Sequence, residues 1–279
     1  MSGKVWFVTG ASRGFGRIWA TAALARGDKV AATARDIGSL AGLAEAYPDS
    51  ALPLRLDVTD RDAVDHAVAE AHRHFGRLDV VVNNAGYGFL GAVEEVSEAD
   101  VQALLDTNFF GALRVTQAAL PILRDQGSGH IVSVSSLAGL VGEPALGLYN
   151  ASKWALEGMM EALSIEVEAF GVKVTLIEPG PYATDFSTQS SLRFATPNAA
   201  YDGVRQGLRA TYGPEDIGDP HATLEALFDV VDSPQPPLRL ILGRTALRHT
   251  RSRYAERLAT WEAWAPVSER AHGSPSVGT

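Results

Sequence analysis

Two residues with complementary chemistry, Tyr149 and Lys153, lie four positions apart in the run Tyr-Asn-Ala-Ser-Lys. On a helix this spacing brings both side chains to the same face. An ammonium group beside a phenol stabilises the phenolate and would lower its pKa from about 10, so the tyrosine could exchange a proton near neutral pH. The pattern Y-x-x-x-K also arises by chance, so its meaning depends on the elements around it.

A glycine-rich turn follows a predicted strand near the start of the chain. Residues 4–9 are a short apolar, β-branched and aromatic run that predicts a buried strand, and a helical pattern covers 14–26. Between them, Gly10 permits a tight turn, Gly14 lets the backbone approach a pyrophosphate, and Gly16 allows close helix–strand packing. The helix N-terminus offers unpaired N–H groups and a positive dipole end to phosphates. This segment predicts a dinucleotide phosphate site.

The glycines follow the spacing G-x-x-x-G-x-G behind Thr9, and further motifs come later in the chain. They are Asp57-Val58, Asn83-Asn84-Ala85-Gly86, Asn108, Ser135-Ser136, Pro179-Gly180 and Thr184. Together with the Tyr-Lys pair, this series resembles the short-chain dehydrogenase/reductase family over roughly residues 4–245. The separation 149 − 136 = 13 between Ser136 and Tyr149 matches the family and selects Ser136 over Ser135 as the active serine.

Periodicity and the resemblance predict the same fold class: α/β, a single doubly wound Rossmann domain over residues 1–245, with a seven-stranded parallel sheet and helices on both faces. Apolar runs that alternate with helical stretches indicate βαβ units. The strands are predicted at 4–9, 29–34, 51–56, 78–83, 129–135, 172–178 and 238–242, and the helices near 14–26, 38–47, 60–75, 97–125, 149–170 and 219–232. Right-handed crossovers place the ligand crevice at the carboxyl ends of the strands, where every motif lies.

Two regions fall outside this regular pattern. Residues 185–217 have little strand signal and are either a lid or a surface excursion; the family covers its substrate with this stretch, so we expect a lid. Residues 246–279 form a C-terminal extension, which we expect to be helical up to about Trp264 and disordered beyond Pro266. Trp261 and Trp264 could pack on the body or on a partner subunit.

The resemblance implies hydride transfer between a nicotinamide and a carbonyl or secondary alcohol, with a catalytic tetrad of Asn108, Ser136, Tyr149 and Lys153. Tyr149 would be the general acid and base, and Lys153 would lower its pKa and bind the nicotinamide ribose. Ser136 would hold the substrate oxygen and stabilise charge on it. Asn108 would hold a water that links Lys153 to solvent.

The same resemblance assigns the cofactor contacts. Asp57 would accept a hydrogen bond from the adenine amino group, with Val58 beside it. Thr184 would anchor the carboxamide, together with backbone near Tyr182, whose ring could intrude on the substrate pocket. The complete predicted cofactor-binding set is Gly10, Ser12, Arg13, Gly14, Phe15, Gly16, Arg35, Asp57, Val58, Asn84, Ala85, Gly86, Tyr149, Lys153, Pro179, Gly180, Tyr182 and Thr184.

The choice of cofactor depends on the charge after the second predicted strand. An NAD enzyme places a carboxylate there for the ribose hydroxyls, and this carboxylate repels a 2′-phosphate. Here the position is Ala34, followed by Arg35, and Arg13 of the glycine loop can approach the same phosphate. We therefore predict NADP(H) as the preferred cofactor. NAD(H) is the alternative, because a register shift of two residues would make Asp36 the ribose ligand.

The predicted substrate pocket is mostly apolar, which favours a bulky, uncharged carbonyl or hydroxyl compound over a small acid. Its predicted lining is Leu137, Val141, Leu146, Tyr182 and Phe186. The tetrad does not encode the direction of reaction, but NADP(H) in cells favours reduction, so a ketoreductase is expected.

Composition excludes several other classes. The net charge of 24 − 33 = −9 argues against a nucleic-acid groove or an anionic membrane surface. The absence of cysteine excludes disulfides and thiolate chemistry, and the seven histidines lack ligand spacing, so we predict no metal site. The first strand starts almost at Met1 and no apolar run reaches about 18 residues, so we expect no signal peptide, no membrane-spanning helix and a cytoplasmic protein.

Other functions on the same scaffold stay open. Epimerases and dehydratases use a G-x-x-G-x-x-G loop and a larger carboxy-terminal domain, neither of which is found here. A non-catalytic NADP(H)-binding sensor or scaffold protein typically loses the tyrosine or the lysine, and an NAD-preferring alcohol dehydrogenase is the remaining alternative. Relatives form homodimers or homotetramers through helices, and Ala155, Met159 and Leu163 have a compatible spacing, although they could equally face the core.

Overall fold

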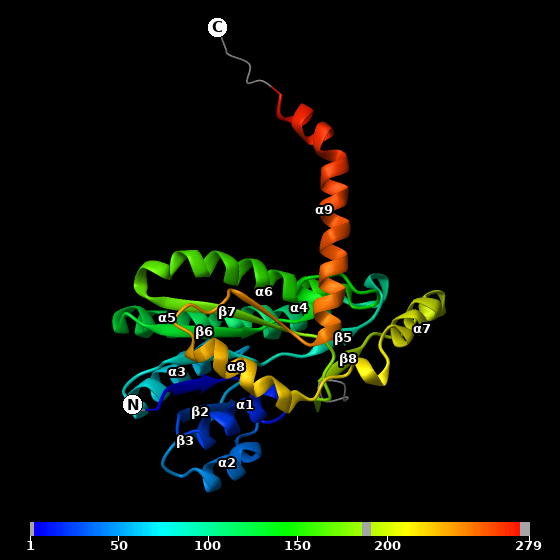
Figure 1. The fold of residues 1–279 in the computed structure, drawn as a ribbon. Coiled ribbons are helices and arrows are strands. Elements are labelled where there is room, and N and C mark those ends of the chain that lie inside the picture. The colour runs from blue at the N-terminus through cyan, green and yellow to red at the C-terminus, as the bar shows by residue number, and fades with distance from the viewer. Residues whose placement is uncertain (1–2, 186–190, 274–279) are drawn as a thin grey trace.

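The computed structural model describes residues 3–185 and 191–273. Its main feature is a seven-stranded parallel sheet in the order β3-β2-β1-β4-β6-β7-β9 (Figure 1). The strands are β1 Val5–Val8, β2 Lys29–Ala34, β3 Ala51–Arg55, β4 Val80–Asn83, β6 Gly129–Val134, β7 Val172–Pro179 and β9 Arg239–Leu242. The predicted fold class is confirmed, and each strand ends within two residues of its predicted bounds.

Helices cover both faces of this sheet (Figure 1). They are α1 Gly14–Ala25, α2 Ala41–Ala46, α3 Arg61–Phe75, α4 Glu98–Leu105, α5 Ala112–Gln126, α6 Gly147–Glu166, α7 Asp202–Thr211, α8 Thr223–Asp232 and α9 Arg244–His272. One apolar core lies under α3, α5 and α6, and a second lies under α1, α2 and α8. Trp6 and Trp19 are fully buried in the second core, and the indole N–H of Trp19 donates to Oγ1 of Thr223 at 2.9 Å. The sheet is therefore held rigidly from both sides.

The sheet brings the predicted motifs to one edge. The chain winds outwards from β1 in both directions, so the strand order reverses between β1 and β4, which is where the ligand crevice of such sheets is expected. The glycine loop follows β1, Asn84 to Gly86 follow β4, and Ser136 follows β6. Because all these strands are parallel, the three segments meet at their carboxyl ends.

A small second sheet ties part of the predicted lid to the loop after β4. Strand β5, Gly88–Leu90, pairs in parallel with β8, Leu192–Phe194, and α7 follows β8 in the chain. The buried carboxylate of Glu95 accepts a hydrogen bond from Arg205 of α7 at 2.5 Å. Residues 191–217 are thus fastened to the body, while their function as a lid stays a prediction.

The α6 residues considered for subunit pairing do not form an exposed apolar face. Leu163 is buried in the core under α6, and Met159 packs partly buried against that core. The exposed apolar residues of α6 are Trp154 and Ile165 instead. The homo-oligomer therefore stays a prediction without support from this helix face.

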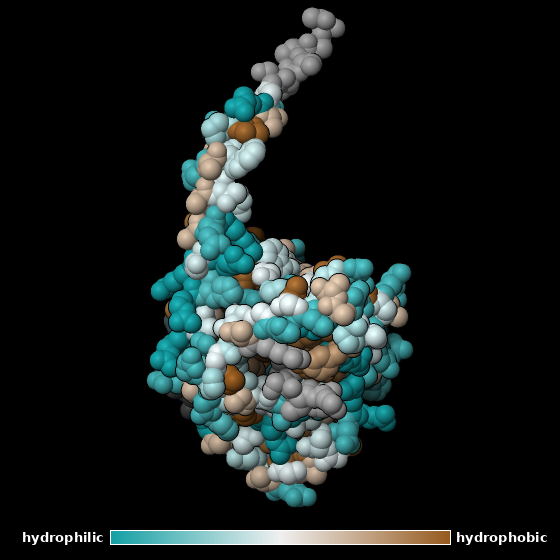
Figure 2. Space-filling model, turned by 90° about the vertical axis from the view of Figure 1, so that its right-hand side faces the viewer, coloured by the Kyte–Doolittle hydropathy of each residue, from teal (hydrophilic) through white to brown (hydrophobic). Residues whose placement is uncertain are grey.

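Helix α9 forms an arm that stands clear of the body (Figure 1, Figure 2). Of its 29 residues only Ala246 and Thr250 are buried.

The prediction of disorder beyond Pro266 was wrong for residues 267–272, because the helix continues to His272. The final six residues of that prediction lie outside the described part of the chain. Pro266 has no N–H for the carbonyl four residues earlier, but on an exposed helix water can bond that carbonyl. None of the described helices is long and apolar enough to cross a membrane.

Candidate active site

The glycine loop needs each of its three glycines. Gly10 and Gly14 have φ angles of +67° and +54°, a region that residues with a Cβ rarely adopt. A Cβ on Gly16 would collide with Nδ2 of Asn84 and with the carbonyl oxygen of Gly10. Two of these positions therefore require glycine for conformation and the third for space.

The loop after β4 holds the glycine loop in place. Nδ2 of Asn84 donates to the carbonyl oxygens of Thr9 and Gly10 at 2.9 and 3.1 Å. The backbone N–H groups of Asn84 and Ala85 both donate to Oγ1 of Thr9, at 2.9 and 3.0 Å. Thr9, which the sequence marks only as part of the motif, thus joins the two loops that flank the crevice.

Helix α1 begins at this loop without a side-chain cap. Its N-cap residue, Arg13, has an extended backbone, and the Arg13 side chain does not cap the first turn. The first N–H groups of a helix need an acceptor and favour negative charge. The glycine loop and the uncapped start of α1 therefore fit the phosphates of a dinucleotide.

The predicted helix over residues 97–125 is interrupted by a π-helical segment, Asp106–Gly111, between α4 and α5. Asn108 lies in this segment and is only 2% exposed. A π-helical turn rotates its side chains out of the regular helical register and occurs frequently at functional sites. The interruption explains how a residue inside a long helix can reach the crevice.

Asn108 joins the loop after β4 to α6. Its Oδ1 accepts from the N–H of Tyr87 at 3.0 Å, and its Nδ2 donates to the carbonyl oxygen of Tyr87 at 2.9 Å and to Oγ of Ser152 at 3.2 Å. A Cβ on Gly86 would lie 3.1 Å from Oδ1 of Asn108 and 3.8 Å from Nζ of Lys153. The absence of a side chain at Gly86 thus leaves room for both polar groups.

The hydroxyl of Ser136 lies near that of Tyr149 and acts to lower the pKa of the phenol. Oγ of Ser136 also accepts from the N–H of Ala138 at 3.1 Å, which orients it at the start of a short 3-10 turn. Ser135 is buried and lies against Gly139 instead. The structure therefore brings Tyr149 together with the serine that the 13-residue spacing selects.

Lys153 lies one helical turn beyond Tyr149 on α6. Its Nζ is 5.8 Å from the centre of the Tyr149 ring and donates to the carbonyl oxygen of Val134 at 2.8 Å. Burial raises the pKa of Tyr149 to about 12, although the nearby hydroxyl of Ser136 opposes this rise. Desolvation of the phenolate thus dominates in this structure, and the expectation that Lys153 lowers this pKa stays a prediction.

Burial also affects the lysine itself. It lowers the pKa of Lys153 to about 8, and the charge of Glu157 opposes this change. At neutral pH the site therefore holds a protonated phenol next to an ammonium group that is close to its own titration range. A protonated phenol is a proton donor, so this state is ready to act as an acid.

Sequence reading missed two buried acids behind Lys153. Glu157 follows Lys153 by four residues, so the spacing that pairs Tyr149 with Lys153 extends one turn further along the same face. That spacing could have identified Glu157. Glu178 lies in β7, inside a run that reads as apolar, and its complete burial has no local signal.

Asp36, the alternative ligand for the ribose hydroxyls after β2, already accepts a hydrogen bond in this structure. Oδ1 of Asp36 accepts from the N–H of Gly38 at 3.0 Å and so caps a short 3-10 turn. Arg35 is exposed beside it. Nε of Arg13 donates to Oγ of Ser191 at 3.0 Å, which directs this guanidinium toward the predicted lid.

The predicted adenine contacts follow β3. Oδ1 of Asp57 accepts from the N–H and the hydroxyl of Thr59, at 3.0 and 2.8 Å, and Asp57 is exposed. Val58 is buried against Gly111, where a Cβ would lie 2.6 Å from Cγ2 of Val58. Val58 therefore anchors this loop, while Asp57 faces outwards.

The loop after β7 approaches the glycine loop. The N–H of Gly180 donates to the carbonyl oxygen of Leu242 at 3.0 Å, directly after Pro179 ends the strand. Cβ of Thr184 lies 3.9 Å from the position of a Cβ on Gly14. Thr184 is thus close to the glycine loop, and this position is compatible with its predicted contact to the cofactor.

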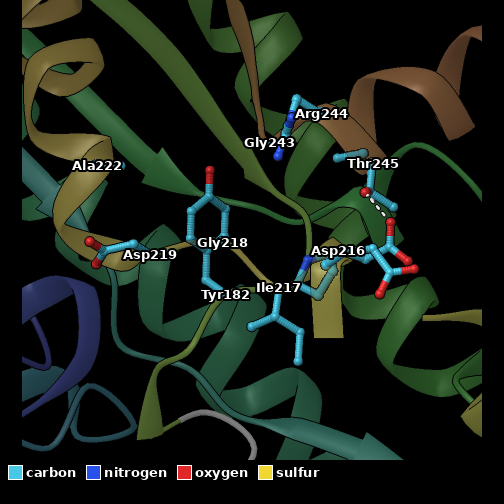
Figure 3. A pocket seen from close by; sticks show the side chains of 12 residues that line it. Tyr182, Asp216, Ile217, Gly218, Asp219, Ala222, Gly243, Arg244 and Thr245 are labelled. Atoms are coloured by element: carbon cyan, nitrogen blue, oxygen red, sulfur yellow. Dashed lines mark hydrogen bonds between the residues drawn. The ribbon is translucent and has the colours of Figure 1, made fainter. Parts of the chain in front are cut away.

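The ring of Tyr182 packs away from Tyr149. It contacts Phe15 edge-on, with the ring centres 5.4 Å apart, and belongs to the apolar core under α1, whereas Tyr149 packs with Phe89. Figure 3 shows the Tyr182 side chain in a cavity of about 180 Å³ that it lines together with Gly218. The expected intrusion of this ring on a pocket at Tyr149 is therefore not found.

The predicted substrate pocket is not brought together as a unit. Leu137 and Val141 are 4% and 0% exposed and pack with Ala246 of α9, whereas Leu146 packs beside Tyr149. Tyr182 belongs to a third cluster, and Phe186 lies outside the described residues. Their role in a substrate pocket stays a prediction; the root of α9 packs against Leu137 and Val141, a contact between distant segments that no local pattern reveals.

Comparisons with known proteins identify the family of this chain. A family model described as short chain dehydrogenase matches residues 4–193, and the chain belongs to the short-chain dehydrogenase/reductase family of oxidoreductases. The chain is 40% identical to Oxidoreductase BOA17 of Botryotinia fuckeliana, over 95% of this chain and 98% of that protein. It is 35% identical to 3-ketodihydrosphingosine reductase of Bacteroides thetaiotaomicron, over 87% of this chain and 89% of that protein.

Solved structures resemble it over most of its length. A short-chain dehydrogenase from Streptomyces avermitilis shares 39% identity, with a TM-score of 0.90 and coverage of 97% of this chain and 98% of that chain. A family member from Burkholderia phymatum was solved with NAD, at 25% identity, a TM-score of 0.80 and coverage of 93% and 95%. An alcohol dehydrogenase from Thermococcus sibiricus was solved with 5-hydroxy-NADP, at 26% identity, a TM-score of 0.73 and coverage of 86% and 96%. Structural relatives thus hold NAD or an NADP derivative.

Proposed function

We propose that the protein is an NADP(H)-dependent oxidoreductase that interconverts a carbonyl compound and a secondary alcohol, with Tyr149 as the general acid and base. The observation that carries this proposal is that Ser136 and Lys153 both lie beside Tyr149: the Ser136 hydroxyl acts on the pKa of the phenol, and Nζ of Lys153 is 5.8 Å from the centre of its ring. This trio follows β6 at the edge of the sheet where the glycine loop follows β1. The proposed catalytic residues and the loop proposed to bind the cofactor therefore lie at the same edge of the sheet.

Each side chain has a distinct part in the proposed reaction. The cofactor, when bound, supplies or accepts the hydride. Tyr149 donates its proton to the carbonyl oxygen in reduction and recovers it in oxidation, and its raised pKa keeps that proton available at neutral pH. Ser136 donates a hydrogen bond to the same oxygen, and the charge of Lys153 favours the phenolate left after proton donation. Asn108 is hydrogen-bonded to the backbone N–H and carbonyl of Tyr87 and so holds the loop after β4 in place.

The end of β2 supports the preference for NADP(H). Asp36 caps the turn that follows β2, so one oxygen of its carboxylate, Oδ1, already accepts from the N–H of Gly38. Arg35 is exposed at the position next to it and can pair with a 2′-phosphate. Comparison of kcat/KM for NADPH and NADH tests this preference. We expect NADPH to be favoured at least tenfold and Arg35→Ser to remove most of that preference; equal or better use of NADH would refute it.

The surroundings of Tyr149 support an apolar carbonyl substrate. Phe89, Leu104 and Ala138 form a buried cluster with Tyr149, and Leu146 packs against it. A site with such walls binds a bulky uncharged compound better than a small acid. The relative named 3-ketodihydrosphingosine reductase is consistent with a keto substrate of this kind.

The decisive test of the proposal is Tyr149→Phe, which removes only the hydroxyl group. We expect NADPH-dependent turnover of a panel of apolar ketones to fall at least about a hundredfold, because the proton donor is lost. Binding of NADPH, measured by fluorescence titration, should change less than about threefold. Tyr212→Phe is the control for loss of a tyrosine hydroxyl elsewhere: Tyr212 is half-buried, and its hydroxyl donates to Glu143 at 3.3 Å.

Two results would count against the proposal. Retention of turnover in Tyr149→Phe would exclude Tyr149 as the proton donor. Binding of NADPH by the wild type without turnover of any ketone or alcohol in the panel would favour a non-catalytic sensor or scaffold protein.

A further inference from the structure

Two carboxyl groups are buried behind the proposed active site. Glu178 has no exposed surface, and the side chain of Glu157 is 7% exposed. Both carboxyl oxygens of Glu178 lack a hydrogen-bond donor, and Oε1 of Glu157 has only the hydroxyl of Ser135 near it. Burial of an ionised carboxylate is costly unless it is paired and hydrogen-bonded, so these oxygens need an explanation.

A single guanidinium faces both acids. Nε of Arg239 lies 2.9 Å from Oε2 of Glu157 and 3.5 Å from Oε1 of Glu178, and Nη2 of Arg239 lies 2.7 Å from Glu161. Glu161 is more than half exposed, so water can stabilise its charge. Within the described structure, the charge of Arg239 is therefore shared among three carboxyl groups, two of which have little or no access to water. The ammonium group of Lys153 acts on Glu157 as a second positive charge, so three carboxyl groups face two cations.

A shared proton resolves this imbalance. The carboxyl groups of Glu157 and Glu178 lie within hydrogen-bonding reach of each other, but two ionised carboxylates offer only acceptors. One proton between them converts the repulsive contact into a hydrogen bond. Burial and the neighbouring negative charge of Glu157 both raise the pKa of Glu178, to about 8, and burial raises that of Glu157.

The pair is coupled to the active site through α6. Glu157 lies one helical turn beyond Lys153 on the buried face, and its charge acts on the ammonium group. Ser135 approaches the pair from the end of β6, since its Oγ and Oε1 of Glu157 would lie 2.5 and 3.1 Å from a Cβ on Gly139. The charged groups that face Glu157 are thus Lys153 and Glu161 on α6, Glu178 on β7 and Arg239 on β9.

We propose that Glu157 and Glu178 share one proton and act as a positioning pair that sets the charge of Lys153. When the proton resides on Glu178, the full negative charge of Glu157 holds the ammonium form of Lys153. When it resides on Glu157, Lys153 loses that support. This extends the proposed function, because it rests on the role of Lys153 beside Tyr149 and adds two residues that act through the lysine.

Direct titration of Lys153 tests the pair without any turnover. The chain has four lysines, Lys4, Lys29, Lys153 and Lys173, so protein labelled with ¹³C at lysine Cε gives four resolvable signals. Loss of one signal in Lys153→Met assigns it. The midpoint for the Lys153 signal is then measured against pH in the wild type and in three variants in which one glutamate becomes glutamine.

The two buried positions should shift this midpoint in opposite directions. Glu157→Gln removes the negative charge that supports the ammonium group, so the midpoint should fall by about one pH unit. Glu178→Gln leaves Glu157 without a competitor for ionisation, so the midpoint should rise. Glu161→Gln is the matched control, because Glu161 binds the same Arg239 but is exposed, and the midpoint should stay unchanged.

Shifts in the same direction, or none in Glu157→Gln, would overturn the proposal, because a merely structural pair has no reason to move the midpoint in opposite senses. If Glu157→Gln does not fold, Glu178→Gln alone still decides the matter, because a fall or no change contradicts the shared proton. Opposite shifts of the Lys153 midpoint in a protein without turnover would retain the proton-sharing pair and reject the proposed function. Turnover without any shift of the midpoint would retain the proposed function and reject the pair.

Discussion

Helices α6 and α9 are the two longest helices of the described structure, and they are held in opposite ways. Eight of the 20 residues of α6 are buried, among them Tyr149, Lys153 and Glu157. Only two of the 29 residues of α9 are buried, and Trp261 and Trp264 are more than 60% exposed. Packing fixes the side chains on the buried face of α6, whereas most of α9 is exposed and a few of its polar side chains, such as Arg257 and His249, bond to the body. The difference teaches that helix length and aromatic content do not identify functional residues here, while burial of polar groups does.

The strongest test of this contrast replaces a cation on each helix. Lys153→Met should lower turnover by at least about a hundredfold, because it removes the charge that stabilises the phenolate of Tyr149. Arg251→Met on the exposed side of α9 should change turnover less than twofold. The comparison fails if steady-state kinetics show similar losses for both variants.

A matched pair of leucines tests the packing directly. Leu156 on α6 is 1% exposed and Leu258 on α9 is 55% exposed. Leu156→Ala should lower the free energy of unfolding by about 2–4 kcal/mol, because it leaves a cavity in the core. Leu258→Ala should lower it by less than about 0.5 kcal/mol. Denaturant unfolding measures both values, and a large loss at Leu258 would show that α9 is covered in solution.

The buried acids behind α6 predict a smaller, pH-dependent effect. The folded-state pKa of Glu178 is raised from 4.5 to about 8, so its stabilising contribution is complete below about pH 4.5 and is lost as the pH rises to 8. Thermal unfolding should therefore show that Glu178→Gln gains stability relative to the wild type between pH 5 and 8. The exposed Glu262 of α9 provides the control, because Glu262→Gln should follow the wild type at every pH. Parallel curves for all three proteins would contradict the raised pKa of Glu178.

Local patterns in the sequence predicted the parts of the fold that depend on local forces. The seven strands follow from apolar runs between helical stretches, and the glycine loop follows from a strand, a turn and a helix in succession. The choice of Ser136 over Ser135 rested on one spacing, and the structure places Ser136, not Ser135, on Tyr149. These features need no knowledge of contacts between distant segments.

The remaining features depend on such distant contacts. The π-helical segment at Asn108 exists because the side chain is fixed by Tyr87 and Ser152, which belong to other elements. The raised pKa of Tyr149 reflects burial by several segments, and the separation of Leu137 from Leu146 reflects cover by the root of α9. The pairing of Glu157 with Glu178 joins a helix to a strand across the core. None of these arrangements leaves a periodic signal in the sequence.

The most direct test of the central claim follows the transferred hydrogen itself. NADPH that carries deuterium at C4 is incubated with an apolar ketone, and the alcohol product is analysed by mass spectrometry. We expect the wild type to place one deuterium at the new carbinol carbon and Tyr149→Phe to yield less than about one hundredth as much labelled alcohol. Labelled product from Tyr149→Phe at the wild-type rate, or alcohol without deuterium from the wild type, would contradict the account.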